Sequence, residues 1–506
     1  MKKQVKGIIG LGAVLVLLGG GYAALRLTDP DKNDSGESSA ELLAVDDTES
    51  KGEGVLLISD NGEEATVSEA FVKNETDELH VIMLTEPTDT SAATYTLDGY
   101  QDLDMNTAVI GTLINNGNGL TSLALIEENS ESLEKFGLAD PDITVDFIYE
   151  SGTKRTLYIG DNAPSGSGVY VMTDESTSVY TASVSALANY SKTLNEFVEK
   201  TVLEEPAEED YPIIKSLKIE REDLDYDILI EYDELSDDEG YTGGTSATHV
   251  MVEPIDCYLT VERSSDITNG MFGLKAEDIY ALHCQESDIA QAGLSEPFCK
   301  VTMSCDDGNV YVLLLSEIFT DDDGKHCYGM LEGGNVIYVL SPDDAKWVTV
   351  LPIDIASKIM IASYVWNVSD LSVKCSSGDE ESFHIALNDD SISISDAKAE
   401  DFNVTKNGKT FDTERYRQFY SFLVSTNAEE FALGEDIPDS EPMATLTYTD
   451  SYTGKTTTID FYDYSSMKAL IAVDGKSKFF CTKSYVNTLI ENVKRINTGE
   501  DYKTTW

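Results

Sequence analysis

The chain has 506 residues, of which 41% are hydrophobic, and its 93 acidic and 35 basic side chains give a formal net charge of −58. This hydrophobic content is normal for a folded protein and argues against extended disorder. A surface so acidic repels nucleic acid and anionic lipid, so we expect no nucleic-acid partner. Solubility outside the cell explains the acidity most simply, and a cation-binding surface is the alternative interpretation.

Residues 1–27 are predicted to form a short cytoplasmic stub and a single transmembrane anchor. Three lysines within the first six residues precede an apolar run of 18 residues from Ile8 to Leu25. Such a run just crosses a bilayer core of ~30 Å. The positive charge before it places the N-terminus in the cytoplasm and the bulk of the chain outside the cell membrane. The anchor residues are Ile8, Leu11, Val14, Leu17, Leu18 and Leu25.

Two features qualify this interpretation of the N-terminus. Gly21-Tyr22-Ala23 would serve as a small-x-small cleavage site, so a cleaved signal peptide is the alternative. The first cysteine is Cys257, which excludes a lipoprotein anchor directly after the run. Residues 28–54 are rich in Asp, Glu, Ser and Gly, and they are predicted to form a flexible acidic linker.

Three α+β repeat units are predicted after the linker, at residues 55–205, 206–355 and 356–506. Their basis is a sequence frame that recurs at intervals of roughly 150 residues, too long for a solenoid. In the first two copies a Gly-Leu opening leads to a proline, a glycine follows that proline by eleven residues, and a Met and a Tyr stand eight apart. The third copy is weaker. The frame residues are Gly137, Leu138, Pro141, Gly152, Gly160, Tyr170 and Tyr180, then Gly293, Leu294, Pro297, Gly308, Tyr328 and Tyr338, then Pro442 and Gly454.

Each unit is predicted to contain strands, a helix, a four-strand antiparallel meander and a closing helix, with helices on one face of the sheet. In the first unit the ranges are strands 55–58, 79–84 and 94–97, helix 105–114, strands 143–149, 156–159, 169–172 and 179–181, and helix 183–200. In the second unit they are strands 214–220, 226–231 and 249–252, helix 274–282, the repeat core 293–340, and a helix from Pro342. In the third unit they are strands 371–375, 383–387 and 392–395, a helix through Tyr416, Phe419, Tyr420 and Leu423 capped by Asp412 or Thr413, strands 444–448, 457–461, 469–473 and 479–481, and a helix through Tyr485, Leu489, Val493 and Ile496.

Cysteines and histidines in the second unit are the first candidates for chemistry. His283-Cys284 and His326-Cys327 flank Cys299 and Cys305, and zinc prefers four such ligands. However, neighbours on a strand face opposite sides, and no CxxC spacing occurs. Cys299 and Cys305 alternate with apolar residues, which is typical of buried core thiols. Core thiols are therefore favoured, a disulfide involving Cys327 stays open, and we expect no metal, cofactor or catalytic residue.

Tyrosines are the second candidates, because the chain has 26 of them. Tyr149, Tyr158, Tyr170 and Tyr180 fall in the predicted first sheet. Aromatic residues are good strand formers, so packing explains most of these side chains. An exposed row of tyrosines would instead bind glycan or a partner protein.

The stretch from Phe136 to Ser183, with FGLADP, ESGTK, IGDNAP and GVYVMTDESTSVYTAS in order, resembles the domain of unknown function DUF4340. The resemblance implies one N-terminal membrane helix followed by extracytoplasmic repeats, and a link to ABC-type export systems that include a gliding-motility auxiliary component. It implies no catalytic residues. We therefore expect a non-enzymatic accessory or scaffold subunit of an ABC-type transport complex, whose protein partner is a permease, an ATPase or a gliding-motility-type auxiliary protein. A cell-wall glycan-binding module is the alternative, and a metal-dependent or hydrolytic enzyme is the third hypothesis.

Overall fold

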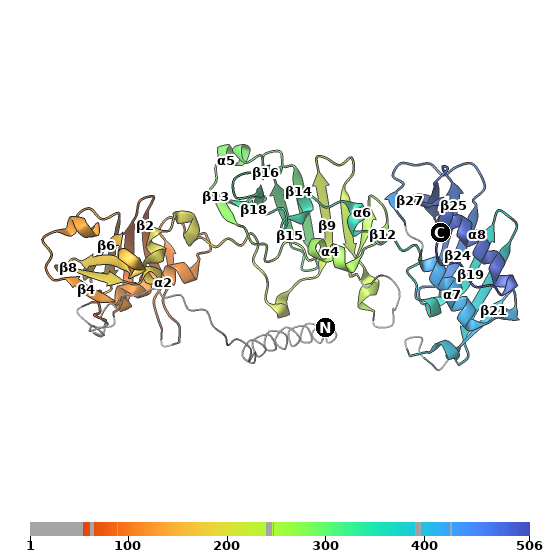
Figure 1. Ribbon diagram of the computed structural model, residues 1–506, viewed down its shortest axis with the longest axis horizontal. Coiled ribbons are helices and arrows are strands. Elements are labelled where there is room, and N and C mark those ends of the chain that lie inside the picture. The colour runs from red at the N-terminus through yellow and green to blue at the C-terminus, as the bar shows by residue number, and fades with distance from the viewer. Residues whose placement is uncertain are drawn as a thin grey trace, which may run out of the picture. The chain divides into compact units, whose positions relative to one another are not determined.

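Three antiparallel β-sheets follow one another along the chain in the computed structural model (Figure 1). The structure describes residues 54–506 except 61–64, 89, 239–244, 246, 390–391, 393–395 and 426–427. The predicted anchor and almost all of the linker lie outside the described residues, as does most of the predicted strand 392–395. Among the helices that are described, none has the length and apolar character needed to cross a membrane. Residues Val55–Trp506 pack as one compact unit.

The first sheet has eight strands in the order β3-β2-β1-β5-β6-β7-β8-β4. Its strands are β1 (Val67–Lys73), β2 (Glu78–Thr85), β3 (Thr94–Leu97), β4 (Ala124–Glu127), β5 (Ile143–Tyr149), β6 (Lys154–Asn162), β7 (Val169–Thr173) and β8 (Ser176–Ala182). Its helical elements are α2 (Thr107–Gly119), η1 (Leu133–Phe136), η2 (Pro164–Gly166), α3 (Val184–Leu187), η3 (Ala188–Ser191) and η4 (Leu194–Phe197).

The second sheet has ten strands in the order β12-β11-β10-β9-β14-β15-β17-β18-β13, with β16 paired to β17 beside this path. Its strands are β9 (Ile214–Arg221), β10 (Ile228–Tyr232), β11 (His249–Glu253), β12 (Cys257–Tyr258), β13 (Asp278–Leu282), β14 (Cys299–Cys305), β15 (Val310–Leu315), β16 (Phe319–Thr320), β17 (Lys325–Leu331) and β18 (Val336–Leu340). Its helical elements are η5 (Glu208–Asp210), η6 (Glu234–Asp237), α4 (Val261–Thr268), α5 (Glu286–Gln291), η7 (Lys346–Val348) and α6 (Pro352–Ile355).

The third sheet has nine strands in the order β22-β21-β20-β19-β24-β25-β26-β27-β23. Its strands are β19 (Val368–Cys375), β20 (Glu380–Leu387), β21 (Phe402–Lys406), β22 (Lys409–Thr410), β23 (Glu430–Phe431), β24 (Ala444–Asp450), β25 (Thr456–Asp463), β26 (Lys468–Val473) and β27 (Lys476–Thr482). Its helical elements are η8 (Val365–Asn367), η9 (Ala399–Asp401), α7 (Thr413–Val424) and α8 (Lys483–Thr498).

The three sheets share one topology. In each, the first strand pairs antiparallel with the first strand of the later four-strand meander, as β1 with β5, β9 with β14 and β19 with β24. In each, one short strand reached through a helix returns to the far edge and pairs with the last meander strand, as β4 with β8, β13 with β18 and β23 with β27. We call β4, β13 and β23 the closing strands. The predicted α+β architecture of three repeated antiparallel sheet units is therefore confirmed.

Each sheet buries a main hydrophobic core under its helices and a smaller one on the opposite face. In the first sheet the smaller core holds Phe136, Leu138, Met172 and Val179. The turn that carries Leu138 can approach the sheet because residue 160 is glycine: a Cβ there would lie 2.2 Å from the carbonyl oxygen of Phe136. The second sheet builds the same small core around Leu294 and Met330.

Several helix predictions are confirmed. The Asp412 carboxylate caps α7 by accepting a hydrogen bond of 2.8 Å from the backbone N–H of Arg415. Tyr416, Phe419 and Leu423 of this helix are buried. The predicted closing helix of the third unit is α8.

Other helix predictions were wrong. Residues 274–282 contain strand β13 instead of a helix, because Ile279 and its neighbours complete the sheet edge; the helix of this unit is α4, which precedes it. The predicted helix 183–200 is broken into α3, η3 and η4, and a turn and η7 replace the helix expected at Pro342. Helix α2 runs past the predicted stop at Asn115-Asn116-Gly117, because Gly117 lets it lie directly against Phe147.

Candidate functional site

The closing strands are the part of the fold where the three units can be compared residue by residue. Before each of them, the chain runs beside the segment that enters the unit, with the same backbone hydrogen bonds. These bonds are Leu57 N to Leu120 O (2.8 Å) and Ser122 N to Val55 O (2.8 Å), Val202 N to Leu274 O (2.8 Å) and Ala276 N to Lys200 O (2.7 Å), and Ala428 N to Lys358 O (3.4 Å). The predicted strand 55–58 is therefore this entry segment, which makes only an isolated bridge to Thr121. The matching pattern makes Ala124, Asp278 and Glu430 equivalent.

It follows that one cross-strand pair is common to the three edges. Leu125 lies opposite Tyr180 on β8, Ile279 opposite Tyr338 on β18, and Phe431 opposite Phe479 on β27. In the first two units a register shift follows this pair, at Leu125/Glu127 and at Ile279/Ala281. The edges of the first and second sheets thus present the same backbone form.

In the second sheet this pair is covered by residues of the first unit. Ile279 is only 3% exposed and packs in one cluster with Val198, Leu103 and Met105. Tyr338 belongs to the same cluster, and its hydroxyl donates to the carbonyl of Thr201 at 3.3 Å. The junction between the first two sheets therefore has an apolar centre.

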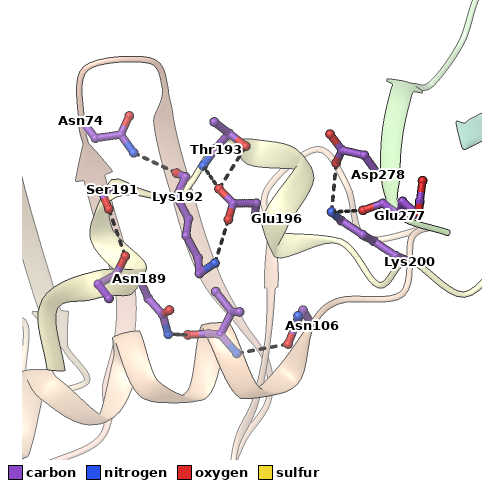
Figure 2. Close-up of polar contacts among 12 residues, drawn as sticks. Asn74, Asn106, Asn189, Ser191, Lys192, Thr193, Glu196, Lys200, Glu277 and Asp278 are labelled. Carbon is purple, nitrogen blue, oxygen red and sulfur yellow. Dashed lines mark hydrogen bonds and ion pairs between the residues drawn. The ribbon is translucent and has the colours of Figure 1, made fainter. Parts of the chain in front are cut away.

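Polar groups form the rim of this junction. The side-chain amide of Asn195 donates to the carbonyl of Ile279 at 2.8 Å. The Lys200 ammonium lies 2.9 Å from the Asp278 carboxylate and donates to the carbonyl of Glu277 at 2.8 Å (Figure 2). The closing strand is thus met by apolar side chains at Ile279, by an amide at the Ile279 carbonyl and by a cation at Asp278.

The covering segment is itself held in place by Asn74, which is buried. Its amide nitrogen donates to the carbonyls of Tyr190 (3.0 Å) and Lys192 (2.9 Å). Glu196 then accepts from the backbone N–H of Thr193 (3.0 Å) and from the Lys192 ammonium (2.8 Å), which closes the turn that presents Asn195 (Figure 2). Asn74 therefore positions the cover from within the first unit.

The third closing strand is covered in a related way by the second unit. Phe431 packs against the cores of both the second and the third sheets. Nearby, the Lys478 ammonium donates to the backbone carbonyl of Asp256 at 2.5 Å, and the Tyr452 hydroxyl bonds to Asp238. The edge of the third sheet is thus also used inside the chain.

The first closing strand differs. Leu125 is 51% exposed, and Leu123 and Ile126, next to it in the chain, and Val184, at the start of α3 after β8, are exposed as well. β4 ends its sheet, and within residues 54–506 as described no strand pairs with its outer side. Four exposed apolar side chains at one sheet edge make the candidate site, which we call the Leu125 edge.

An acidic rim surrounds the Leu125 edge. Glu128, Glu131 and Glu134 are exposed in the loop that follows β4. The Glu127 carboxylate lies 3.1 Å from the Lys135 ammonium, and the hydrogen bond from Lys135 lowers the pKa of Glu127. The rim therefore combines one paired carboxylate, Glu127, with three exposed acidic side chains.

The predicted frame residues fall mainly in turns and in the two cores. Gly152 and Gly308 close equivalent hairpins with hydrogen bonds to the third residue before them, and Gly454 closes a turn one residue wider. Gly137 ends η1, and Gly293 stands in the equivalent turn before Leu294. Tyr170 and Tyr328 pack in the small cores. Pro141, Pro297 and Pro442 each lie just before a meander begins and are partly buried.

The cysteines are core residues, as predicted for Cys299 and Cys305. All seven carry free thiols, and five of them, including Cys327, are buried. Burial raises the pKa of Cys299 and of Cys327 to about 12. In the described part of the chain no three His, Cys, Asp or Glu side chains are grouped as metal ligands would be.

His326 makes a different contact from the one considered for zinc. Its Nδ1 lies 2.7 Å from Glu277 and its Nε2 lies 3.0 Å from Asp321. Although burial opposes the charged ring, the two carboxylates raise the pKa of His326 above its usual value. The His326 ring therefore ties the β16–β17 hairpin to Glu277, the residue that precedes β13.

The tyrosines of the first sheet are not exposed. Tyr149 is buried, and Tyr158, Tyr170 and Tyr180 are half-buried. The more exposed Tyr211, Tyr364, Tyr452 and Tyr464 lie on separate loops. The first sheet therefore presents no row of exposed tyrosines.

A cavity of about 260 Å³ lies between the second and third sheets, lined by Tyr258, Tyr448, Lys455 and four aspartates among others. Asp233 and Asp450 accept hydrogen bonds from backbone N–H groups of their own turns, and Asp474 accepts one from the backbone N–H of Thr458 on β25. These three carboxylates therefore have structural hydrogen bonds within the sheets and turns that line the cavity.

Sequence reasoning missed the Leu125 edge. The segment Leu123-Ala124-Leu125-Ile126 is apolar, but it is too short to be recognised as a strand by alternation. Extending the repeat frame upstream from Gly137 without a gap would align Leu125 with Ala281, so a shift of two residues is needed to reach its structural equivalent Ile279.

Comparison with protein families gives one match: residues 95–234 match the family described as "Domain of unknown function (DUF4340)". This range begins in β3, includes the Leu125 edge and the cover formed by 195–200, and ends after β10. The predicted resemblance is confirmed over these residues. No curated protein and no solved structure matches the chain.

Proposed function

We propose that this chain, which contains a DUF4340 domain, is a non-enzymatic scaffold that acts by protein–protein contact. In this proposal a single N-terminal helix holds it in the cell membrane, the sheets lie outside the cytoplasm, and it serves as an accessory subunit of an ABC-type transport complex. The transport assignment rests on the family resemblance and on the lysine-flanked apolar run at residues 8–25.

The observation that carries the binding role is the exposed Leu125 edge. Terminal units of repeat proteins normally present a polar outer face, because their outer surface has no neighbouring repeat to cover it. Here the equivalent of the buried Ile279 is an exposed leucine with three exposed apolar neighbours. A surface that resembles an internal junction and is exposed in the first described unit supports contact with another protein.

The proposal is tested by crosslinking in intact cells, detergent extraction, affinity capture of the full-length protein and mass spectrometry. We expect an ABC-type permease or ATPase among the captured proteins, and its loss when residues 1–27 are replaced by an unrelated anchor. Recovery of cell-wall fragments alone, or of no transport subunit, would contradict the proposal and favour the glycan-binding alternative.

A further inference from the structure

The two internal junctions define what a closing strand accepts. At the junction between the first and second sheets, the covering residues supply apolar side chains that pack on Ile279, an amide that donates to its carbonyl, and a lysine that pairs with Asp278. The cover there is the 3₁₀ turn η4 and the residues after it, which contact the edge through side chains. No strand is added to the edge by this cover.

The Leu125 edge offers the apolar centre and the backbone carbonyl at equivalent positions, whereas Ala124 stands where Asp278 does and the acidic groups lie further along the chain. Leu125 and the half-buried Tyr180 replace Ile279 and Tyr338 at the centre. The carbonyl of Leu125 is at the position that accepts from Asn195 in the second unit. Acidic side chains follow the strand at Glu127 and Glu128.

Two occupants from this chain fit poorly. A second copy would bring another strongly acidic surface to an acidic rim, since the chain carries a net charge of −58. The entry-segment position is already filled by Val55 and Leu57. The position left open beside Leu125 corresponds to the one that Val198, Leu103 and Met105 fill beside Ile279. Those three residues belong to the preceding unit.

We propose that the Leu125 edge binds a turn or helix end of a different protein, which places an apolar side chain on Leu125 and Tyr180 and Lys or Arg groups against the exposed Glu128 of the acidic rim. The acidic rim favours basic residues in the partner by charge complementarity. The equivalence of Leu125 to Ile279 favours an apolar side chain of the partner packed on Leu125. This inference rests on the protein-binding role proposed above and adds the site and the chemistry of the partner segment.

The test uses the full-length chain in its own cells, with a photo-crosslinking amino acid at position 123, which is 55% exposed beside the edge. We expect an adduct with a different polypeptide, whose crosslinked peptide has an apolar residue within a few positions of Lys or Arg. Leu125→Glu should reduce the adduct at least tenfold, and Glu128→Lys should reduce it several-fold. Leu84→Glu and Glu86→Lys, at exposed positions elsewhere on the first sheet, are the matched controls and should leave it unchanged.

Several results would overturn the inference. These are an adduct with a second copy, with lipid or with residues 1–53 of the same chain, a crosslinked peptide without a basic residue, no adduct at all, or an adduct that persists in Leu125→Glu. Thermal melting of each variant shows that loss of the adduct is not loss of folding.

The identity of the adduct separates this inference from the proposed function. If the crosslinked protein lies outside any transport complex, the transport role fails and the edge remains a binding site. If transport subunits are captured but none crosslinks at position 123, the edge fails and the transport role stands.

Discussion

Leu125 and Ile279 occupy the same position in two units of one chain, and they differ in exposure by a wide margin, 51% against 3%. Both belong to a closing strand and both pair with a tyrosine. The difference arises because Ile279 has a preceding sheet to cover it, whereas the described chain places no sheet before Leu125. Each unit thus forms the same kind of sheet edge, and among the described residues the edges of the second and third units are covered while that of the first unit is exposed.

The largest expected effect in this comparison comes from charging the covered edge. Ile279→Glu places a carboxylate among Val198, Leu103 and Met105, and we expect it to lower the free energy of unfolding by about 4 kcal/mol. Leu125→Glu at the equivalent exposed position should change it by less than about 0.5 kcal/mol. Chemical denaturation of both variants measures the difference, and equal losses would mean that the two edges are equally buried.

The next effect concerns the residue that holds the cover in place. Asn74→Ala leaves the carbonyls of Tyr190 and Lys192 without their donor, and we expect a loss of about 2 kcal/mol in the free energy of unfolding. Relative to the unmodified protein, the variant should also show a larger increase in amide hydrogen exchange at residues 194–200 than in β5. Asn403→Ala, at an exposed strand position, is the control; a loss as large there would show that the effect of Asn74 is not specific to the cover.

A third effect concerns the residue just before the closing strand. This residue is Glu277 in the second unit, where it pairs with His326, and Leu123 in the first. Because the pKa of His326 is raised in the folded protein, its contribution to stability is present below about pH 6.5 and is lost as pH rises through the raised value. His326→Gln should therefore lower the melting temperature more at pH 6 than at pH 9. His384→Gln serves as the control, because the exposed His384 ring pairs with Asp370 at the surface. A pH-independent difference for His326 would show that its charge has no role in the contact.

The smallest effect is expected at the rim. Lys200→Ala removes a partly exposed ion pair with Asp278 and should cost less than about 1 kcal/mol. Val55→Lys, at the equivalent position in the first unit, should be neutral because Ala124 stands where Asp278 does. Double-mutant analysis of Lys200 and Asp278 measures the coupling; a coupling above 2 kcal/mol would mean that the rim contributes as much as the apolar centre.

Much of the fold was predictable because the meander strands have clear patterns. Alternation located β14 through Cys299, Val301, Met303 and Cys305, and helical spacing located α7 and α8. The closing strands were not predictable in this way. Ile279 and Phe431 lie on short edge strands whose partners are far away in sequence, and local pattern carries no information about such pairing.

The site was beyond local pattern for the same reason. Leu125 looks like any apolar residue in the sequence, and its exposure depends on which sheet precedes its unit. The predicted frame residues, such as Gly160 and Leu138, mark the structural repeat. The difference in edge exposure between the units lies upstream of that frame, where the repeat was not aligned.

The most direct measurement combines folding and binding in one variant. Leu125→Glu should melt within about 1 °C of the unmodified protein, and it should retain less than a tenth of the partner captured through position 123. Leu84→Glu should match the unmodified protein in both respects. Undiminished capture by Leu125→Glu, or a loss of stability as large as that of Ile279→Glu, would contradict the account of an open first edge that binds another protein.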